Sequence, residues 1–201
     1  MSPRVEVWFE FASTYSYPAI MRVEAAARAR GVGLAWRAFL LGPIFRAQGW
    51  NDSPFNLYPA KGRYMWRDLE RTCQALGLPW RRPSVFPRNG LAAARVACRF
   101  EDAPWLPAFV RGVYTANFAE DRDIADPAVL SALLADLGQP AAEVLAESVT
   151  ETSKTKLRGR TDEAMACGIF GAPSFRSFGS GEELFWGNDR LEAALDHAAT
   201  P

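Results

Sequence analysis

The sequence predicts an α/β fold, because strand patterns stand at both ends of the chain and a long helical stretch separates them. Residues 5–11 alternate in the period of two that is typical of a strand, and residues 34–39 read as a second strand after a helical segment. Residues 174–178 and 183–186 are short strand patterns around a Gly-Ser-Gly turn, which indicates a hairpin. The predicted order is therefore βαβ, helical block, ββα.

The first helix is predicted over residues 17–30. Ser16 can cap this helix, Pro18 suits its first turn and Gly31 ends it. A βαβ unit of this length implies two parallel strands joined by a right-handed crossover.

The middle of the chain is predicted to be helical. Residues 42–59 are expected to be irregular, since they are rich in Gly, Pro and Asn, and the proline-rich residues 79–90 are expected to form a loop. Helices are expected at residues 61–76, 91–100, 104–118, 127–137 and 140–149, with one more from Thr155 or Arg160 to Cys167. Asp126 is a predicted N-cap before Pro127. We expect a discontinuous α/β domain, 1–45 and 165–201, with 46–164 inserted as a helical domain.

The composition argues against several classes of protein. The 201 residues are 49% hydrophobic and carry no formal net charge, so no nucleic acid partner is implied. No apolar run is long enough to span a bilayer, and the N-terminus does not resemble a signal peptide. Cys73, Cys98 and Cys167 form neither a Cys-x-x-Cys pair nor a zinc spacing. We expect a cytoplasmic protein without a bound metal or a membrane partner.

Conventional nucleophilic catalysis finds little support in this chain. The single histidine, His197, lies on the last predicted helix, where a surface position near the negative end of the helix dipole is expected. A Ser-His-Asp or Cys-His mechanism is therefore not supported.

Ser13 and Ser16 lie between a strand end and a helix start, where the helix dipole favours an anion. They have the spacing of a Cys-x-x-Cys redox pair, but neither can form a disulfide. We assign Ser16 to capping and Ser13 to function. Without a base Ser13 is a poor nucleophile, yet it can donate a hydrogen bond to a bound thiolate. Such a bond, worth roughly 1.5–3 kcal/mol, would lower a thiol pKa by about one to two units.

Three further segments can bind a ligand. If Pro173 is cis, the N–H and C=O of Ala172 turn toward Ser13, and an extended peptide could pair with them; the alternative is an ordinary trans proline that begins an edge strand. Asn188 is a predicted N-cap, and the Asp189 carboxylate beside it could bind an ammonium group. Lys61 lies at the start of a predicted helix, where the helix dipole disfavours a cation, which hints at a role in binding. The loop residue Asn51 lies upstream of it.

Taken together, these segments resemble the kappa-class glutathione transferases and, more closely, the 2-hydroxychromene-2-carboxylate isomerases, both in the DsbA-like branch of the thioredoxin superfamily. The resemblance covers essentially the whole chain and rests on residues 9–17, 40–45, 59–65, 170–173 and 186–190. It implies a thioredoxin-like (DsbA-type) βαβ–ββα sheet with a large inserted helical domain. Thr14 departs from the pattern, because the family usually has proline after the catalytic serine.

The resemblance also implies a ligand and a reaction. Glutathione would be the cofactor, with Ser13 facing its sulfur and the backbone of Ala172, before a cis Pro173, pairing with its cysteinyl unit. The γ-glutamyl end would lie at Asn188, Asp189 and Arg190, and the glycyl end or the pocket at Lys61 and Asn51. The implied reaction interconverts 2-hydroxychromene-2-carboxylate and trans-o-hydroxybenzylidenepyruvate, through thiolate addition, bond rotation and elimination, in aromatic hydrocarbon catabolism.

Two alternatives stay open on the sequence. A kappa-like transferase would use the same glutathione site and release a thioether product. A non-catalytic member would bind thiols or extended peptides without turnover. The resemblance implies a homodimer and a small aromatic carboxylate as substrate, with an arginine of the helical block as the expected partner of the carboxylate. Tyr15, Tyr17 and Trp66 are candidates for the pocket wall or for the core.

Overall fold

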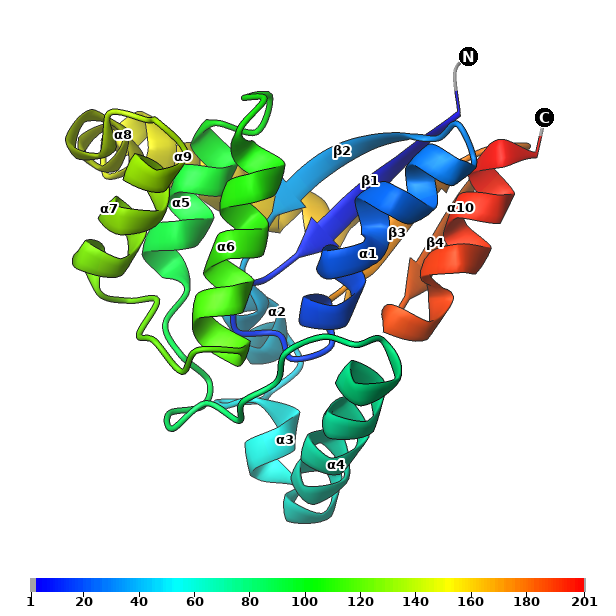
Figure 1. Ribbon diagram of the computed structural model, residues 1–201. Helices are drawn as coiled ribbons and strands as arrows, with labels where there is room; N and C mark the ends of the chain where they lie inside the picture. Colours follow the sequence, from blue (N-terminus) through cyan, green and yellow to red (C-terminus); the bar gives the residue numbers. More distant parts are fainter. Residues whose placement is uncertain (1–2, 201) are drawn as a thin grey trace.

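A computed structural model of the chain describes residues 3–200 and confirms the predicted sheet (Figure 1). The strands are β1 (Arg4–Phe9), β2 (Gly33–Ala38), β3 (Ser174–Phe178) and β4 (Glu182–Trp186), in the spatial order β2-β1-β3-β4. β1 is parallel to β2 and antiparallel to β3, and β3 and β4 form the expected hairpin. The sheet thus joins the two ends of the chain.

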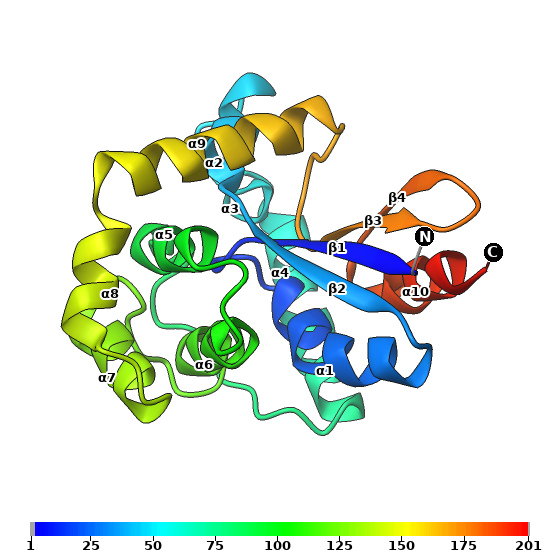
Figure 2. The same cartoon turned by 90° about the horizontal axis from the view of Figure 1, so that it is seen from above.

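Helices cover both faces of the sheet (Figure 2). α1 (Ser16–Ala29) and α10 (Leu191–Ala199) lie on one face, and α9 (Glu151–Ala166) crosses the other. α1 buries Ile20, Val23 and Ala27, which recur at helical spacing on one side of the helix. This apolar stripe explains why the segment packs against the sheet.

The remaining helices extend the molecule beyond the β2 edge and below the sheet. α5 (Leu91–Arg99), α6 (Leu106–Phe118), α7 (Pro127–Asp136) and α8 (Ala141–Ser148) form a group beside β2, and α3 (Pro54–Leu57) and α4 (Pro59–Ala75) project separately (Figure 1). One buried cluster contains Val5 and Val7 of β1 together with Val113 and Leu130 of the helices. The division into 1–45 with 165–201 and an inserted 46–164 stays a prediction.

The structure corrects the sequence prediction for residues 42–59, which are not wholly irregular. α2 (Leu41–Ala47) forms there because Ile44 is buried against the sheet, in a cluster with Trp8 and Phe39. α3 forms because the side chain of Ser53 accepts a hydrogen bond from the Phe55 N–H at 3.3 Å. Both helices are short, so their signal in the sequence is weak.

Three predicted helix starts also change, while one is confirmed. α1 has Tyr15 at its N-cap, and Ser16 is buried inside the first turn and caps nothing. α9 begins at Glu151, because the Thr150 side chain accepts from the Ser153 N–H at 3.3 Å. Residues Asn188–Arg190 form a 3₁₀ turn before α10, without a capping bond from the Asn188 side chain. Asp126 caps α7 as predicted, at 2.8 Å from the Ala128 N–H.

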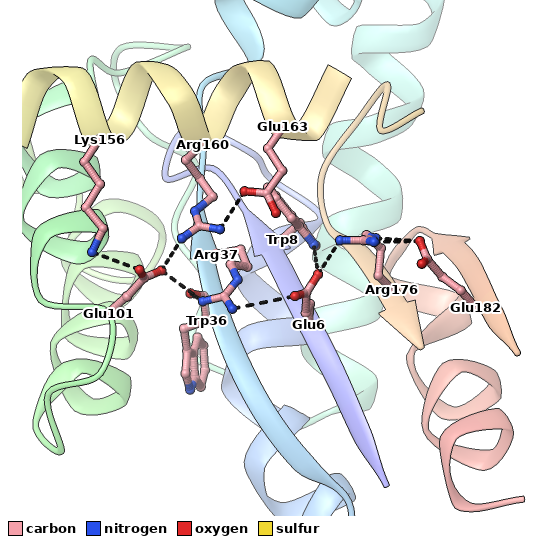
Figure 3. A network of polar contacts seen from close by, with 10 residues as sticks. All are labelled: Glu6, Trp8, Trp36, Arg37, Glu101, Lys156, Arg160, Glu163, Arg176 and Glu182. Atoms are coloured by element: carbon pink, nitrogen blue, oxygen red, sulfur yellow. Dashed lines mark hydrogen bonds and ion pairs between the residues drawn. The ribbon is translucent and has the colours of Figure 1, made fainter. Parts of the chain in front are cut away.

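An ion-pair network fills the space between α9 and the sheet (Figure 3). Glu6 on β1 accepts from Arg176 of β3 at 2.7 Å and lies 3.6 Å from Arg37 of β2. Arg37 continues to Glu101 at 2.9 Å, and Glu101 reaches Arg160 of α9 at 2.7 Å. Each buried charge therefore has an opposite charge beside it, as burial requires.

Three observations complete the description. His197 is half-buried rather than a free surface residue, since its Nδ1 lies 2.8 Å from the Ser177 hydroxyl. Cys73 and Cys98 are buried, and Cys167 is half-buried. Within residues 3–200, no helix combines the length and the apolar character that crossing a membrane requires.

Gly62 controls how closely α3 approaches α4. A Cβ at position 62 would overlap the carbonyl oxygen of Phe55, so we expect Gly62→Ala to push the helices apart and lower the free energy of unfolding by roughly 1–3 kcal/mol. Gly159 is the matched control in α9, because its Cβ position is open; Gly159→Ala should raise the stability by about 0.5–1 kcal/mol. Chemical denaturation measures both, and equal effects of the two substitutions would contradict the steric argument.

Candidate active site

The strand register brings three turns to one edge of the sheet. Trp8 pairs with Ser174, and Ser174 pairs with Trp186, so these three residues lie in line across β1, β3 and β4. Because β3 runs antiparallel to both neighbours, the chain leaves β1 and β4 and enters β3 at this same edge. The segments 10–16, 170–173 and 187–190 are therefore neighbours, although 159 positions separate Ser13 from Ala172.

A cavity of about 1430 Å³ opens at this edge. Its wall includes the three turns, α2, the start of α4 and residues 86–91. Six of the eight predicted site residues line it: Ser13, Asn51, Lys61, Ala172, Asn188 and Asp189. Pro173 is buried behind Ala172, and Arg190 is exposed outside the wall, with its guanidinium 3.1 Å from the Asp189 carboxylate. Six of the eight predicted residues therefore share one cavity wall, and Pro173 and Arg190 do not line it.

Ser13 and Ala172 are in direct contact. The Ser13 hydroxyl donates to the Ala172 carbonyl oxygen at 2.9 Å, and the peptide bond between Ala172 and Pro173 is cis, as the family resemblance implied. The Ala172 N–H donates no hydrogen bond within the part of the chain that the structure describes. A donor and an acceptor of one peptide edge are thus placed beside the serine hydroxyl.

Thr14 is anchored although it stands in the place of a proline. Its side chain is buried, and its hydroxyl donates to the Met65 sulfur of α4 at 3.0 Å. Its carbonyl oxygen accepts from the Tyr17 N–H at 3.2 Å, which begins α1. These two contacts fix the turn and the direction of Ser13.

Glu10 is a functional candidate that the sequence analysis missed. Its side chain is buried, lines the cavity and accepts from the Ala12 N–H at 2.9 Å. Burial raises the pKa of Glu10 to about 7, against the opposing pull of the Ala12 and Ser13 N–H groups. A perturbed carboxyl group in a cleft is a mark of functional sites. The available signal was an acid three residues before Ser13, at the end of the alternating strand pattern.

Arg22 holds the turn that carries Asn188. Its guanidinium donates to the Asn188 carbonyl oxygen at 2.5 Å and to the Asn188 side-chain oxygen at 3.1 Å. The Gly187 N–H donates to the Pro173 carbonyl oxygen at 2.9 Å, so the turn is also tied to the cis-proline segment. Nothing in the sequence marks Arg22, because it lies in the middle of α1.

Aromatic side chains make much of the cavity wall apolar. Phe170 and Trp186 pack with their ring centroids 4.8 Å apart and are both about half exposed. Tyr15 lines the wall and donates to Asp68 of α4 at 3.0 Å. Tyr17 belongs to the core and Trp66 to a separate groove. Of the three aromatic candidates, only Tyr15 is therefore a wall residue.

Three basic side chains line the cavity within residues 3–200, and they differ in availability. Arg88 is buried and bound to Asn117 and Asp121, so its charge is already neutralised. Lys61 lies over the Tyr58 ring, 5.2 Å from its centroid, and Arg46 lies on α2; neither has an acidic partner in the described chain. Lys61 and Arg46 are the cations available to a carboxylate ligand.

A sheet of this order, with a serine hydroxyl at the first strand end and a cis-proline turn beside it, defines a thioredoxin-fold protein of the DsbA type. The chain belongs to the DSBA-like thioredoxin domain family, whose model matches residues 4–199. Ser13 and Ser16 of this chain have the spacing of a Cys-x-x-Cys pair but cannot form a disulfide.

Within this class, the chain is similar to isomerases and to kappa-class glutathione transferases. The chain is 28% identical to a 2-hydroxychromene-2-carboxylate isomerase of Sphingobium xenophagum, over 96% of each protein. It is also 28% identical to a glutathione S-transferase kappa 2 of Caenorhabditis elegans, over 98% of this chain and 92% of that protein. The solved structure of a 2-hydroxychromene-2-carboxylate isomerase has a TM-score of 0.81 at 24% identity, covering 94% of this chain and 90% of the other. These findings confirm the family resemblance and the fold.

The Glu10 carboxyl group should make stability depend on pH. Because its folded pKa is about 7 instead of 4.5, the fold favours the protonated form, and stability falls as the pH rises between these values. Above the folded pKa the penalty is constant, at roughly 3 kcal/mol. Glu10→Gln keeps an acceptor for the Ala12 N–H, so we expect it to stabilise the protein at about pH 8 and not at about pH 4.5. Denaturant unfolding at both pH values measures this, and a pH-independent difference would contradict it.

Proposed function

We propose that the protein is a glutathione-dependent isomerase of conjugated aromatic keto acids, of the type that interconverts 2-hydroxychromene-2-carboxylate and trans-o-hydroxybenzylidenepyruvate. The observation that carries this proposal is the Ser13 hydroxyl, 2.9 Å from the Ala172 carbonyl oxygen, on the wall of a cavity with aromatic sides. Relatives named as isomerases and as glutathione transferases support an enzymatic role.

The chemistry of the cavity wall fits glutathione. The free Ala172 N–H and its carbonyl can pair with an extended peptide in the manner of an added strand. Asp189 offers an exposed carboxylate to the ammonium of the γ-glutamyl end, and Lys61 offers a cation to the glycyl carboxylate. When bound, glutathione supplies a thiol nucleophile that can add reversibly to a conjugated double bond.

Ser13 favours the ionised form of a bound thiol. Its hydroxyl has one proton to donate, which in this structure goes to the neutral carbonyl of Ala172. A bond to a thiolate is charge-assisted and about twice as strong, so the hydroxyl turns to sulfur when the thiol ionises. This bond is worth roughly 1.5–3 kcal/mol and replaces a neutral bond of about 0.5–1.5 kcal/mol, so the net gain lowers a thiol pKa by about one unit from about 8.5.

The rest of the wall suits an aromatic carboxylate. Phe170, Trp186 and Tyr15 offer flat apolar surface to a ring. If Lys61 binds the glycyl carboxylate, Arg46 is the remaining cation without an acidic partner, and we assign it to the substrate carboxylate.

A kappa-like transferase is the second candidate, because the Caenorhabditis elegans relative is as similar as the isomerase. The two functions differ in the fate of glutathione. An isomerase returns it unchanged after each turnover, whereas a transferase consumes it to form a thioether. Chromatography of the reaction mixture with a benzylidenepyruvate substrate separates these outcomes. The proposal includes a homodimer, which light scattering in solution tests.

Ser13→Ala should leave glutathione binding in place and reduce ionisation of the bound thiol. We expect glutathione still to bind, with the pKa of the bound thiol higher by about one unit. Calorimetry follows the binding, and thiolate absorbance across a pH series gives the pKa. Ser16→Ala is the matched control, because Ser16 is buried away from the cavity wall and should leave the thiol pKa unchanged. Failure of the unsubstituted protein to bind millimolar glutathione would overturn the proposal.

Arg46→Met should weaken binding of the keto-acid substrate but not binding of glutathione. We expect KM for the substrate to rise by about 10- to 100-fold, as for loss of one charge-assisted contact, with the Kd for glutathione unchanged. Arg63→Met is the control, since Arg63 lies in the separate groove with Trp66 and does not line the cavity. A rise in the Kd for glutathione alone would instead place the glycyl carboxylate at Arg46.

A further inference from the structure

Ionisation of a bound thiol leaves a proton that some group must accept. Ser13 can donate to the sulfur but cannot hold this proton, and the single histidine contacts Ser177 and Phe185, away from the cavity wall. The acceptor must therefore be sought among the carboxyl groups of the cavity.

Four carboxyl groups line the cavity, and one of them differs from the others. Three are half-buried or exposed and each has a polar side-chain partner: Asp52 with Asn56, Asp68 with Tyr15, and Asp189 with Arg190. Glu10 is buried and has neither a cation nor a side-chain donor beside it within residues 3–200. Its negative charge is the least compensated in the cavity.

Local geometry holds the Glu10 carboxyl group beside Ser13. The Ser13 N–H donates to the Glu10 carbonyl oxygen at 2.9 Å, and the Ala12 N–H fixes Oε2 at 2.9 Å, so both residues belong to one hydrogen-bonded turn. The other oxygen, Oε1, faces Gly90 of the neighbouring loop. A Cβ there would make an ordinary contact with Oε1 at 3.5 Å but would lie only 2.8 Å from Cβ of Phe11, so a glycine lets this loop approach the end of β1 closely.

None of the groups that face Glu10 within residues 3–200 changes its charge near neutral pH, so Glu10 is the group that gains or loses a proton there. From α6, Tyr114 donates its hydroxyl to the Glu10 carbonyl oxygen at 2.7 Å, and burial raises the pKa of Tyr114 well above its usual value, so it stays protonated. From the loop, Arg88 is neutralised by Asp121, and Asn89 and Gly90 carry no charge. From the turn before α1, Ser13 and Thr14 are neutral.

We propose that Glu10 is the proton acceptor of a thiol bound at Ser13. The S–H bond breaks, its electron pair stays on sulfur, and the proton forms an O–H bond on the Glu10 carboxylate. The total charge of the pair is unchanged by the transfer, so no net charge is added to the buried site. This inference rests on the proposed function, and it adds the base that the Ser13 hydroxyl lacks.

The two groups are matched in acidity. The pKa of Glu10 is about 7, and a thiol of pKa about 8.5 lowered by about one unit comes close to this value. A proton moves readily between groups of similar pKa, and a base near the working pH is the most effective. An ordinary exposed glutamate would be too weak a base, so burial of Glu10 is a functional feature in this account.

Proton release on binding tests the proposal without any turnover. At about pH 8 Glu10 is ionised in the free protein. In the complex the negative charge of the neighbouring thiolate raises the pKa of Glu10 further, so the proton that passes from sulfur to Glu10 stays there and does not reach the buffer. Calorimetry with glutathione in buffers of different ionisation enthalpy should show release near zero for the unsubstituted protein and near one proton for Glu10→Gln. Thiolate absorbance should appear in both. Asp68→Asn is the matched control, since it removes a cavity carboxylate that has other partners and should release no more than the unsubstituted protein.

A second measurement serves if Glu10→Gln does not fold. In protein with ¹³C-labelled glutamate carboxyl groups, the Glu10 signal should move to its protonated position when glutathione is added at about pH 8. Thiolate formation with release of a full proton, the same in Glu10→Gln, would overturn the role of Glu10 and leave glutathione binding intact. Absence of glutathione binding would instead overturn the proposed function, and with it this inference.

Discussion

The site depends on the antiparallel pairing of β1 with β3. This pairing joins residues from the two ends of the chain, and its register sets Trp8 opposite Ser174. The turn that follows β1 and the turn that precedes β3 must then meet, which brings the Ser13 hydroxyl to the Ala172 carbonyl across 159 positions of sequence. A shift of one residue would send every side chain of β1 to the opposite face, so the same core packing that stabilises the sheet also fixes the site.

Glu6 and Glu10 are two buried acids of one segment, and only the first has cations beside it in the described part of the chain. Glu6 lies between Arg176 and Arg37 in the network under α9, where its charge is compensated (Figure 3). Glu10 lies beyond the end of β1, where backbone N–H groups but no cation of residues 3–200 lie beside its carboxyl group, and burial raises its pKa to about 7. A carboxylate in an ion-pair network stabilises structure and stays charged, whereas an isolated one remains able to gain and lose a proton near neutral pH.

Much of this arrangement could be predicted from the sequence, because strands with a period of two and a Gly-Ala-Pro turn are local signals. The strands and the parallel βαβ unit followed from them, whereas the cis Pro173 and most of the predicted wall residues came from the family resemblance. The features that could not be predicted depend on tertiary contacts. α2 forms because Ile44 is buried against the sheet, and Ser16 is buried and does not cap α1. The raised pKa of Glu10 and the hydrogen bonds from Arg22 to Asn188 likewise arise only when distant segments meet.

The contact between Ser13 and Ala172 also explains how a neutral hydroxyl could discriminate between two forms of a ligand. In the resting state the hydroxyl has a partner, and a neutral bond of this kind contributes about 0.5–1.5 kcal/mol. A neutral thiol is a weak acceptor and offers no gain over the carbonyl, but a thiolate offers roughly 1.5–3 kcal/mol. The hydroxyl therefore changes partner only when the sulfur is charged. An interaction made with the reactive form alone favours catalysis rather than tighter binding of the resting ligand. Paired with a carboxyl group that takes up the proton, it would let this fold activate a bound thiol without a cysteine of its own at the site.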